Sequence, residues 1–156
     1  MSYYGATICL GGHVISSHDA NLVKYCTECG KPTFSKCPAC HAPIHGSMYV
    51  SGIVVIGGTD YTKPMYCYEC GSPYPWTQEI LDNAVLLLSL DEDLDELSKN
   101  LIKDAIPGLL VESSTSPIAI AQYKKGISHA GQFLKDSLYQ LLVDVMSETV
   151  KNAICG

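Results

Sequence analysis

The chain has 156 residues, a net charge of −6 and an apolar content of 47%. That length suits one ordinary domain or a small metal-held module followed by a second part. No apolar run approaches the roughly 20 residues that cross a bilayer, which excludes an integral membrane protein. All ten basic residues are Lys, and the acidic excess lies entirely within residues 77–156. This balance disfavours a protein that grips nucleic-acid phosphates with clustered basic side chains.

Residues 1–32 predict a small β-hairpin ribbon with metal ligands at both ends. Short β-rich segments at residues 14–17 and 22–25 flank a polar turn at residues 17–21. Residues 32–36 are then expected to connect this ribbon to the next one. We therefore predict a first ribbon over residues 1–32 that is complete in itself.

Residues 37–73 predict a second, larger ribbon. Its insertion contains two β-branched or aromatic segments, 48–50 and 53–56, separated by Gly52 and followed by Gly57 and Gly58. The few apolar side chains available would not stabilise such a module alone. A structural zinc ion supplies an apparent ~10–16 kcal/mol, which is large beside the ~5–15 kcal/mol stability of a whole domain.

The metal-binding pattern consists of three Cys-x2-Cys pairs and one Cys-x3-His pair. Two such pairs supply the four ligands of a tetrahedral zinc ion, so eight ligands predict two Zn²⁺ ions per chain. With four protein ligands each, both ions would be structural rather than catalytic. Exposed turn positions are the expectation for His18, His41 and His45. The predicted ligands are Cys9, His13, Cys26 and Cys29 for the first ion, and Cys37, Cys40, Cys67 and Cys70 for the second.

This sequential pairing of half-sites has one alternative. In a cross-brace, the Cys9/His13 pair would share an ion with Cys37/Cys40, and Cys26/Cys29 would share one with Cys67/Cys70. The ligands are the same in both arrangements. Cys155 is left without a partner and is expected to be a free thiol, with modification of the Cys155-Gly156 end as a minor alternative.

Cysteine usage also bears on the cellular compartment. The N-terminal segment has no basic stretch followed by an apolar core of signal-peptide length. Zinc-bound thiolates are therefore favoured over disulfides, and we expect a cytoplasmic protein.

Residues 77–156 predict a helical region. Thr77 is the expected N-cap of the first helix, with Trp76 packed against Leu81. A second helix is expected from Asp91 to about residue 105, because Pro107-Gly108 would end it and open a linker over residues 107–116. The next helical segment is expected to begin at Ser116-Pro117, with Gly126 and Gly131 as points where the pattern could divide.

The last predicted element is one long amphipathic helix over residues 132–154. It carries two adjacent apolar rows, Leu134, Leu138, Leu141 and Val145 in one and Leu142, Met146 and Val150 in the other. If either row were exposed, it would form a patch that soluble monomers seldom tolerate, which predicts a homo-oligomer or a protein partner. The alternative is that the preceding helices cover both rows within one chain.

Three motifs together resemble a known family. They are Ile8-Cys9-Leu10-Gly11-Gly12-His13-Val14, the three Cys-x2-Cys pairs, and Tyr74-Pro75-Trp76. The chain resembles an uncharacterised bacterial double zinc-ribbon family, domain of unknown function number 2321. The resemblance covers nearly the whole chain and implies a bacterial or phage-borne cytosolic zinc-ribbon protein. It implies no activity.

We therefore predict an α+β protein with two zinc ribbons before a helical half. The leading hypothesis is a non-enzymatic interaction protein that assembles through its C-terminal helix. One alternative is a nucleic-acid-binding zinc-ribbon protein that uses exposed aromatics among its ten Tyr. The other is a metalloenzyme, which would need an open position on one zinc ion.

Overall fold

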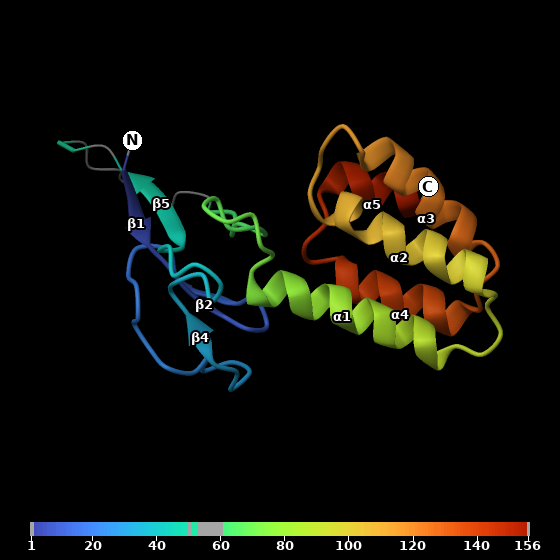
Figure 1. Cartoon of the computed structure of the whole chain (residues 1–156), viewed down its shortest axis with the longest axis horizontal. Helices are drawn as coiled ribbons and strands as arrows, with labels where there is room; N and C mark the ends of the chain where they lie inside the picture. The colour runs from blue at the N-terminus through green and yellow to red at the C-terminus, as the bar shows by residue number, and fades with distance from the viewer. Residues whose placement is uncertain (1, 50, 53–60, 156) are drawn as a thin grey trace. The chain divides into compact units, whose positions relative to one another are not determined.

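The computed structural model describes residues 2–49, 51–52 and 61–155. The chain forms two compact units, Met1–Glu79 and Ile80–Gly156, each of which is considered separately below. Short strands make up the first unit, and helices follow them in the chain (Figure 1). The two cysteine clusters also lie in the first unit. This confirms the predicted α+β class. Within the described residues, no helix is both long and apolar enough to span a membrane.

A three-stranded antiparallel sheet forms one part of the first unit. Its central strand is β2 (Thr7–Cys9), with β3 (Val14–Ser16) on one side and β4 (Thr33–Phe34) on the other. Ile8 pairs with both Val14 and Phe34. The expectation that residues 32–36 only connect two ribbons is wrong, because β4 lies in this segment.

Residues 22–25 do not form the second predicted strand of the first ribbon. Both edges of β2 are already paired, so this segment is left with a single bridge between Tyr25 and Pro32. The buried Thr7 hydroxyl donates to Asp19 O at 2.6 Å, and it accepts from Leu22 N at 3.2 Å. These hydrogen bonds satisfy the Asp19 carbonyl and the Leu22 amide, so these backbone groups need no partner on a neighbouring strand.

A second, two-stranded ribbon joins the start of the chain to the insertion of the predicted second ribbon. Here β1 (Ser2–Gly5) pairs antiparallel with β5 (His45–Tyr49). The predicted strand at residues 48–50 thus lies partly in β5, whereas the one at 53–56 falls outside the described residues. Since residues 2–9 pair with β3 in the predicted first ribbon and with β5 in the predicted second one, the two ribbons are not independent modules. The shared core contains Ala6, Ile8, Cys37, Ile44, Cys67, Tyr74 and Trp76.

Helix α1 (Pro75–Leu90) begins earlier than expected. The carbonyl of Tyr74 accepts hydrogen bonds from Thr77 N at 2.9 Å and Gln78 N at 3.0 Å, so Thr77 lies inside the first turn. The Thr77 hydroxyl donates to Met65 O at 2.7 Å instead of capping the helix. Trp76 is buried in the core of the first unit, and its Nε1 donates to Pro64 O at 3.0 Å. The predicted N-cap is therefore wrong.

Helix α2 (Glu96–Leu110) starts later and ends later than predicted. Asp91 caps a turn, because its Oδ1 accepts from Leu94 N at 2.8 Å, and Asp95 is the N-cap, accepting from Ser98 N at 3.1 Å. Pro107 lies inside the helix, so the linker predicted at residues 107–116 shrinks to residues 111–115. A mid-helix Pro costs about 3 kcal/mol, whereas burying each large apolar side chain contributes roughly 1.5–3 kcal/mol. Three such side chains near Pro107 are buried, namely Ile106, Leu109 and Leu110.

Helices α2 and α3 (Ser116–Ile127) pack closely through glycines. A Cβ on Gly126 would lie 2.7 Å from Ile102 Cγ1, and one on Gly108 would lie 2.7 Å from Ala119 Cβ. Gly126 is therefore a packing position inside α3, whereas Gly131 is the N-cap of the next helix. Of the two predicted dividing points, only Gly131 separates two helices.

The single long helix predicted over residues 132–154 is wrong. It is divided into α4 (Gln132–Leu142) and α5 (Glu148–Cys155). The hydroxyl of Ser147 accepts from Val150 N at 3.3 Å and caps α5, with acidic Glu148 in the first turn. Five stripe residues are buried within the unit: Leu134, Leu138, Leu142, Met146 and Val150. The chain itself covers most of the apolar surface from which an exposed assembly stripe was inferred.

Candidate metal centres

The three Cys-x2-Cys pairs adopt one backbone conformation. The fourth residue after each first Cys donates its N–H to that Cys carbonyl, at 2.8, 2.8 and 2.9 Å, and has a positive φ of 73°, 65° and 74°. These residues are Gly30, His41 and Gly71. The turn directs backbone amides at the sulfurs: Glu28 N lies 3.4 Å from Cys26 Sγ, and Glu69 N lies 3.4 Å from Cys67 Sγ.

His41 is the exception among these three turn residues, because it carries a side chain in a conformation that favours glycine. A left-handed conformation costs an L-residue about 1–2 kcal/mol. We expect His41→Gly to keep both metal ions. Relief of the backbone strain should raise the free energy of unfolding of the metal-loaded protein by about 1 kcal/mol, and the greater entropy of Gly in the unfolded state offsets part of that gain. His41→Val should lower it, because a β-branched residue tolerates this φ poorly. Chemical denaturation with metal analysis checks both; loss of one ion in His41→Gly would make His41 a ligand.

The first cluster contains Cys9, His13, Cys26 and Cys29, whose ligand atoms all lie within 4.8 Å of one another. Cys9 Sγ is 3.7 Å from Cys29 Sγ and 3.4 Å from His13 Nδ1, and Cys26 Sγ is 3.6 Å from His13 Nδ1. A tetrahedral zinc ion separates two sulfurs by about 3.8 Å, and a sulfur and a nitrogen by about 3.6 Å, given its usual bond lengths. The cluster therefore fits a tetrahedral ion.

The second cluster contains Cys37, Cys40, Cys67 and Cys70, within the same 4.8 Å limit. The separations are 3.7 Å between Cys37 Sγ and Cys70 Sγ, and 3.6 Å between Cys40 Sγ and Cys67 Sγ. Both are close to the edge of a tetrahedral four-sulfur site and far from the ~2.05 Å of a disulfide. This cluster also fits a tetrahedral ion.

The structure places the eight predicted ligands in the sequential arrangement and not in the cross-brace. Cys155 is exposed and lies in neither cluster. His18 and His41 are exposed and also outside both. The expectation for His45 is wrong, because this residue lies in β5 and is partly buried between two rings, as described below.

The surroundings of the candidate ligands act in both directions: Cys67 is shifted toward its thiolate, whereas, against a backbone hydrogen bond from Ala42, burial and hydrogen bonds to the neighbouring thiols raise the pKa of Cys40 to about 12. His13 presents Nδ1 to the sulfurs, while its Nε2 lies 3.7 Å from a carboxylate oxygen of Glu28. A carboxylate that accepts a hydrogen bond from the outer nitrogen of a ligating His fixes its tautomer, but the Glu28 contact is longer than such a bond. A backbone hydrogen bond from Cys70, opposed by burial and aided by one from Glu69, lowers the pKa of Cys67 to about 6. Because the thiolate is the metal ligand, Cys67 is already close to its binding form at neutral pH.

The arrangement of these motifs along the chain agrees with a family comparison. The sequence profile of DUF2321, described as an uncharacterized protein conserved in bacteria, matches residues 2–154. The chain belongs to this family. Searches of the curated proteins and of the solved structures gave no match. The DUF2321 description names no activity, so chemical function has to be argued from the site itself.

Sequence reasoning missed a stack of three aromatic rings on the first unit. His45 lies between Tyr3 and Tyr68, with ring centroids 4.0 Å apart on each side and interplanar angles of 9° and 8°. Tyr3 and Tyr68 are 45% and 50% exposed. Only the pairing of β1 with β5 brings Tyr3 to His45, and the local sequence carries no signal of it.

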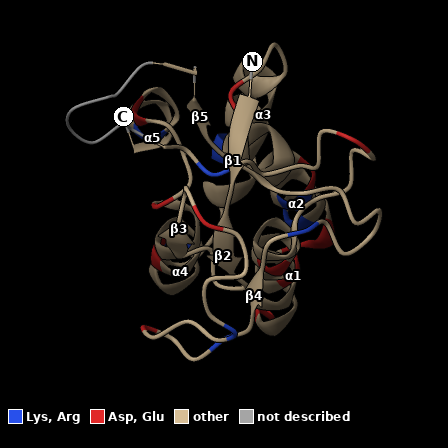
Figure 2. Ribbon diagram, turned by 90° about the vertical axis from the view of Figure 1, so that its left-hand side faces the viewer, with Lys and Arg blue, Asp and Glu red and all other residues tan. Residues whose placement is uncertain are grey.

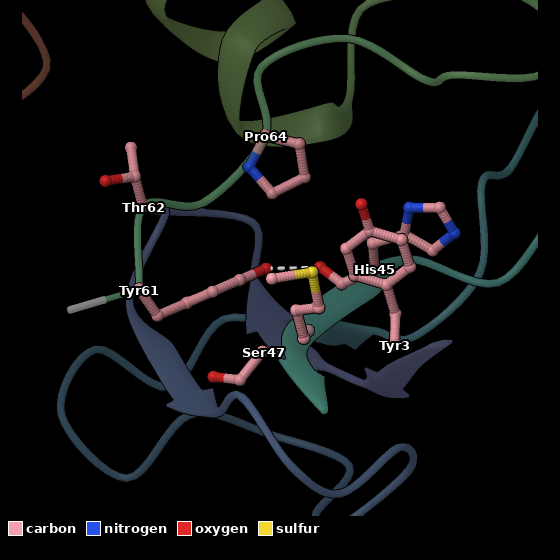
Figure 3. A pocket seen from close by; sticks show the side chains of 8 residues that line it. Tyr3, His45, Ser47, Tyr61, Thr62 and Pro64 are labelled. Carbon is pink, nitrogen blue, oxygen red and sulfur yellow. Dashed lines mark hydrogen bonds between the residues drawn. The ribbon is translucent and has the colours of Figure 1, made fainter. Parts of the chain in front are cut away.

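A cavity of about 360 Å³ lies beside this stack. Tyr3, His45 and Tyr61 line it together with Ser47, Thr62 and Pro64 (Figure 3). The Tyr61 hydroxyl donates to His45 O at 2.6 Å and fixes one wall. The cavity contains none of the candidate metal ligands.

Proposed function

We propose that this member of DUF2321 is a non-enzymatic interaction protein whose first unit is held by two structural Zn²⁺ ions. The observation that carries the proposal is the closure of both clusters: four side chains of the chain surround each position at tetrahedral spacing. Four protein ligands leave no coordination position for water or substrate. The metalloenzyme alternative would need such a position.

Zinc is the ion that this donor set favours. Tetrahedral sites made of four thiolates, or of three thiolates and one imidazole, are typical of zinc, and iron–sulfur chemistry is the main competitor for four thiolates. The His in the first cluster favours zinc there. Cysteines that serve as metal ligands rather than in disulfides are typical of reducing compartments, which supports a cytoplasmic location.

Protein binding or self-assembly is the second part of the proposal, and its surface differs from the one that the sequence suggested. On helix α1, Val85, Leu86 and Leu90 are 42%, 56% and 70% exposed. Leu86 and Leu90 are four residues apart and so share one helix face. Exposed apolar side chains on one face are typical of surfaces that bind a protein. The occupant we propose is a second copy of this chain.

The assembly proposal predicts that Leu86→Asp with Leu90→Asp converts a homo-oligomer to a monomer while both zinc ions stay bound. Burying two carboxylates in an apolar interface would cost more free energy than the apolar contacts between the copies contribute. Light scattering after size exclusion measures the mass, and elemental analysis counts the ions. Asn152→Asp, which adds charge at an exposed polar position of α5, is the control. A wild-type protein that stays monomeric at tens of micromolar would overturn the assembly proposal and leave the metal proposal standing.

Single-stranded nucleic acid is the second candidate, and the exposed stack of Tyr3, His45 and Tyr68 favours it. Bases stack on such rings with little sequence preference, at about 1–3 kcal/mol each. Charge argues against it, since Asp and Glu are spread over several helices (Figure 2) and the chain has no Arg. A gel shift across a salt series, with Tyr3→Ala and Tyr68→Ala as variants, separates this candidate from protein binding. Binding that survives both substitutions would exclude the stack as its site.

A further inference from the structure

The cavity beside the aromatic stack takes no part in the proposed function, yet its size is that of a small-molecule site. Its volume of about 360 Å³ falls within the roughly 300–1,000 Å³ usual for such sites. Tyr3 and His45 lie on one side of it, and the Tyr61 side chain enters from the other (Figure 3). Small-molecule sites combine aromatic walls with a few polar groups that orient the ligand. These walls therefore restrict the class of ligand that fits.

The Tyr3 ring is a wall suited to a planar aromatic ligand. It lies 4.0 Å from the His45 ring at an interplanar angle of 9°, and Tyr68 stacks on the other face of His45. Tyr3 is thus the end of the stack, and no aromatic ring among the described residues covers its second face. The residue is 45% exposed and lines the cavity. A flat heteroaromatic ring bound there would extend the stack by one member.

The charge of the lining favours an uncharged ligand. The described residues of the lining include no Lys, Asp or Glu. Lys63 lies between Thr62 and Pro64 in the sequence, but its Nζ donates to Gly12 O at 2.9 Å. An anionic ligand would find no cation among the described lining residues, and a cationic ligand would find no carboxylate. Moving an unpaired charge from water into such a site costs free energy.

The hydroxyl groups of the lining favour a ligand with an N–H donor. The Tyr61 hydroxyl donates its proton to His45 O at 2.6 Å. The Ser47 hydroxyl donates its proton to Ser17 Oγ at 3.0 Å. Because a hydroxyl has one proton, both oxygens can only accept from a ligand, whereas the exposed hydroxyl of Thr62 can donate or accept. An amino group on the planar ring meets this pattern.

We propose that the cavity binds an uncharged planar heteroaromatic ring that carries an amino group, which is the chemistry of the adenine base. The ring stacks on Tyr3, and its amino group donates to the oxygen of Ser47 or Tyr61. The uncharged character of the described lining assigns this base to a free nucleoside rather than to a nucleotide or a nucleic-acid strand. The inference goes beyond the proposed function, because neither the metal ions nor a second copy of the chain contacts the ligand.

The first test compares two nucleosides by isothermal titration calorimetry on the full chain loaded with Zn²⁺. Adenosine should bind with a Kd on the order of 0.1 mM, given the modest binding free energy per atom of ligands of this size. Purine riboside, which lacks only the amino group, should bind about 10-fold more weakly because it leaves the acceptor oxygens unpaired. Equal binding of the two nucleosides, or no binding of adenosine, would overturn the inference.

The second test places the ligand on Tyr3. Tyr3→Ala should weaken adenosine binding about 10-fold or more, whereas Tyr3→Phe should retain it because the ring is kept. Tyr4→Ala is the matched control, since it removes the neighbouring ring of β1, which contacts His18 and Tyr49 and does not line the cavity. Equal affinities in Tyr3→Ala and Tyr4→Ala would contradict the inference. Elemental analysis checks that each variant keeps its metal ions, and if Tyr3→Ala loses them, the nucleoside pair on the wild type decides alone.

The third test separates the possible sources of the base. Adenosine monophosphate and a single-stranded oligodeoxyadenylate should bind no more tightly per base than adenosine at any salt concentration. Tighter binding of either, falling steeply as salt is raised, would overturn the nucleoside assignment, and for the oligonucleotide it would favour the single-stranded nucleic-acid candidate instead. None of these outcomes changes the metal count or the mass of the assembly, so failure here leaves the proposed function standing.

Discussion

Replacing Cys37 with Ser should release the second metal ion and unfold the first unit while the helices of the second unit persist. Cys37 is 1% exposed and belongs both to the cluster and to the core around it. The apparent binding energy of a structural zinc ion, ~10–16 kcal/mol, is as large as the stability of a typical domain, so a core this small does not survive its loss. Elemental analysis should find one ion or none.

Two spectroscopic signals separate the units in this experiment. Trp76, the single Trp of the chain, is buried in the first unit, so its emission should shift to longer wavelength. The far-ultraviolet circular dichroism of α2 to α5 should remain. Cys155→Ser is the matched control, because Cys155 is exposed and outside both clusters. Loss of the helical signal together with the metal would show that the whole chain folds as one cooperative unit.

Gly46→Ala should destabilise the first unit by about 3 kcal/mol or more. A Cβ at this buried position of β5 would overlap the carbonyl oxygen of Ser17 and lie 2.7 Å from that of Gly5. Overpacking costs typically ~1–3 kcal/mol when side chains can shift, and here the obstacles are backbone atoms on two other segments. Denaturation followed by Trp76 emission measures the change.

Gly11→Ala is the control for this substitution. Its added Cβ would meet other atoms at 3.6–3.7 Å, which is ordinary van der Waals contact. Its melting curve should match that of the wild type within about 1 kcal/mol. Equal melting of Gly46→Ala and the wild type would mean that β5 does not pack against the Ser17 segment in solution.

Local spacing predicted which eight side chains lie together in the two clusters, and long-range pairing explains most of what it missed in the first unit. Each half-site needs only a tight turn. Gly30 and Gly71 indicate that turn in the sequence, whereas His41 does not, because a positive φ is unusual for a residue other than glycine. By contrast, β1 pairs with β5 across about 40 residues. No local pattern encodes that register, so the sheet contacts and the ring stack built on them could not be predicted.

In the helical unit, the apolar spacing predicted helices but not their ends. Pro107 read as a stop, yet the burial of Ile106, Leu109 and Leu110 outweighs its cost. The division between α4 and α5 falls inside a continuous apolar stripe, where the only local signal is Ser147 followed by Glu148. Both errors have the same cause. Intrinsic helix propensity leaves the alternative helix ends close in free energy, and tertiary packing decides between them.

The sequential grouping of the candidate ligands also sets the order in which a growing chain could acquire the two proposed ions. All four ligands of the first cluster have been synthesised by Cys29, eight residues before the next cysteine, Cys37. At a synthesis rate of roughly 5–20 residues per second, on the order of a second passes between the addition of Cys29 and that of Cys37. During that time the growing chain contains no cysteine outside the first cluster that could compete for the ion. In a cross-brace, Cys9 and His13 would have to wait for Cys40. Synthesis from the N-terminus thus favours the observed partners over the misligated ones before the second unit has been made.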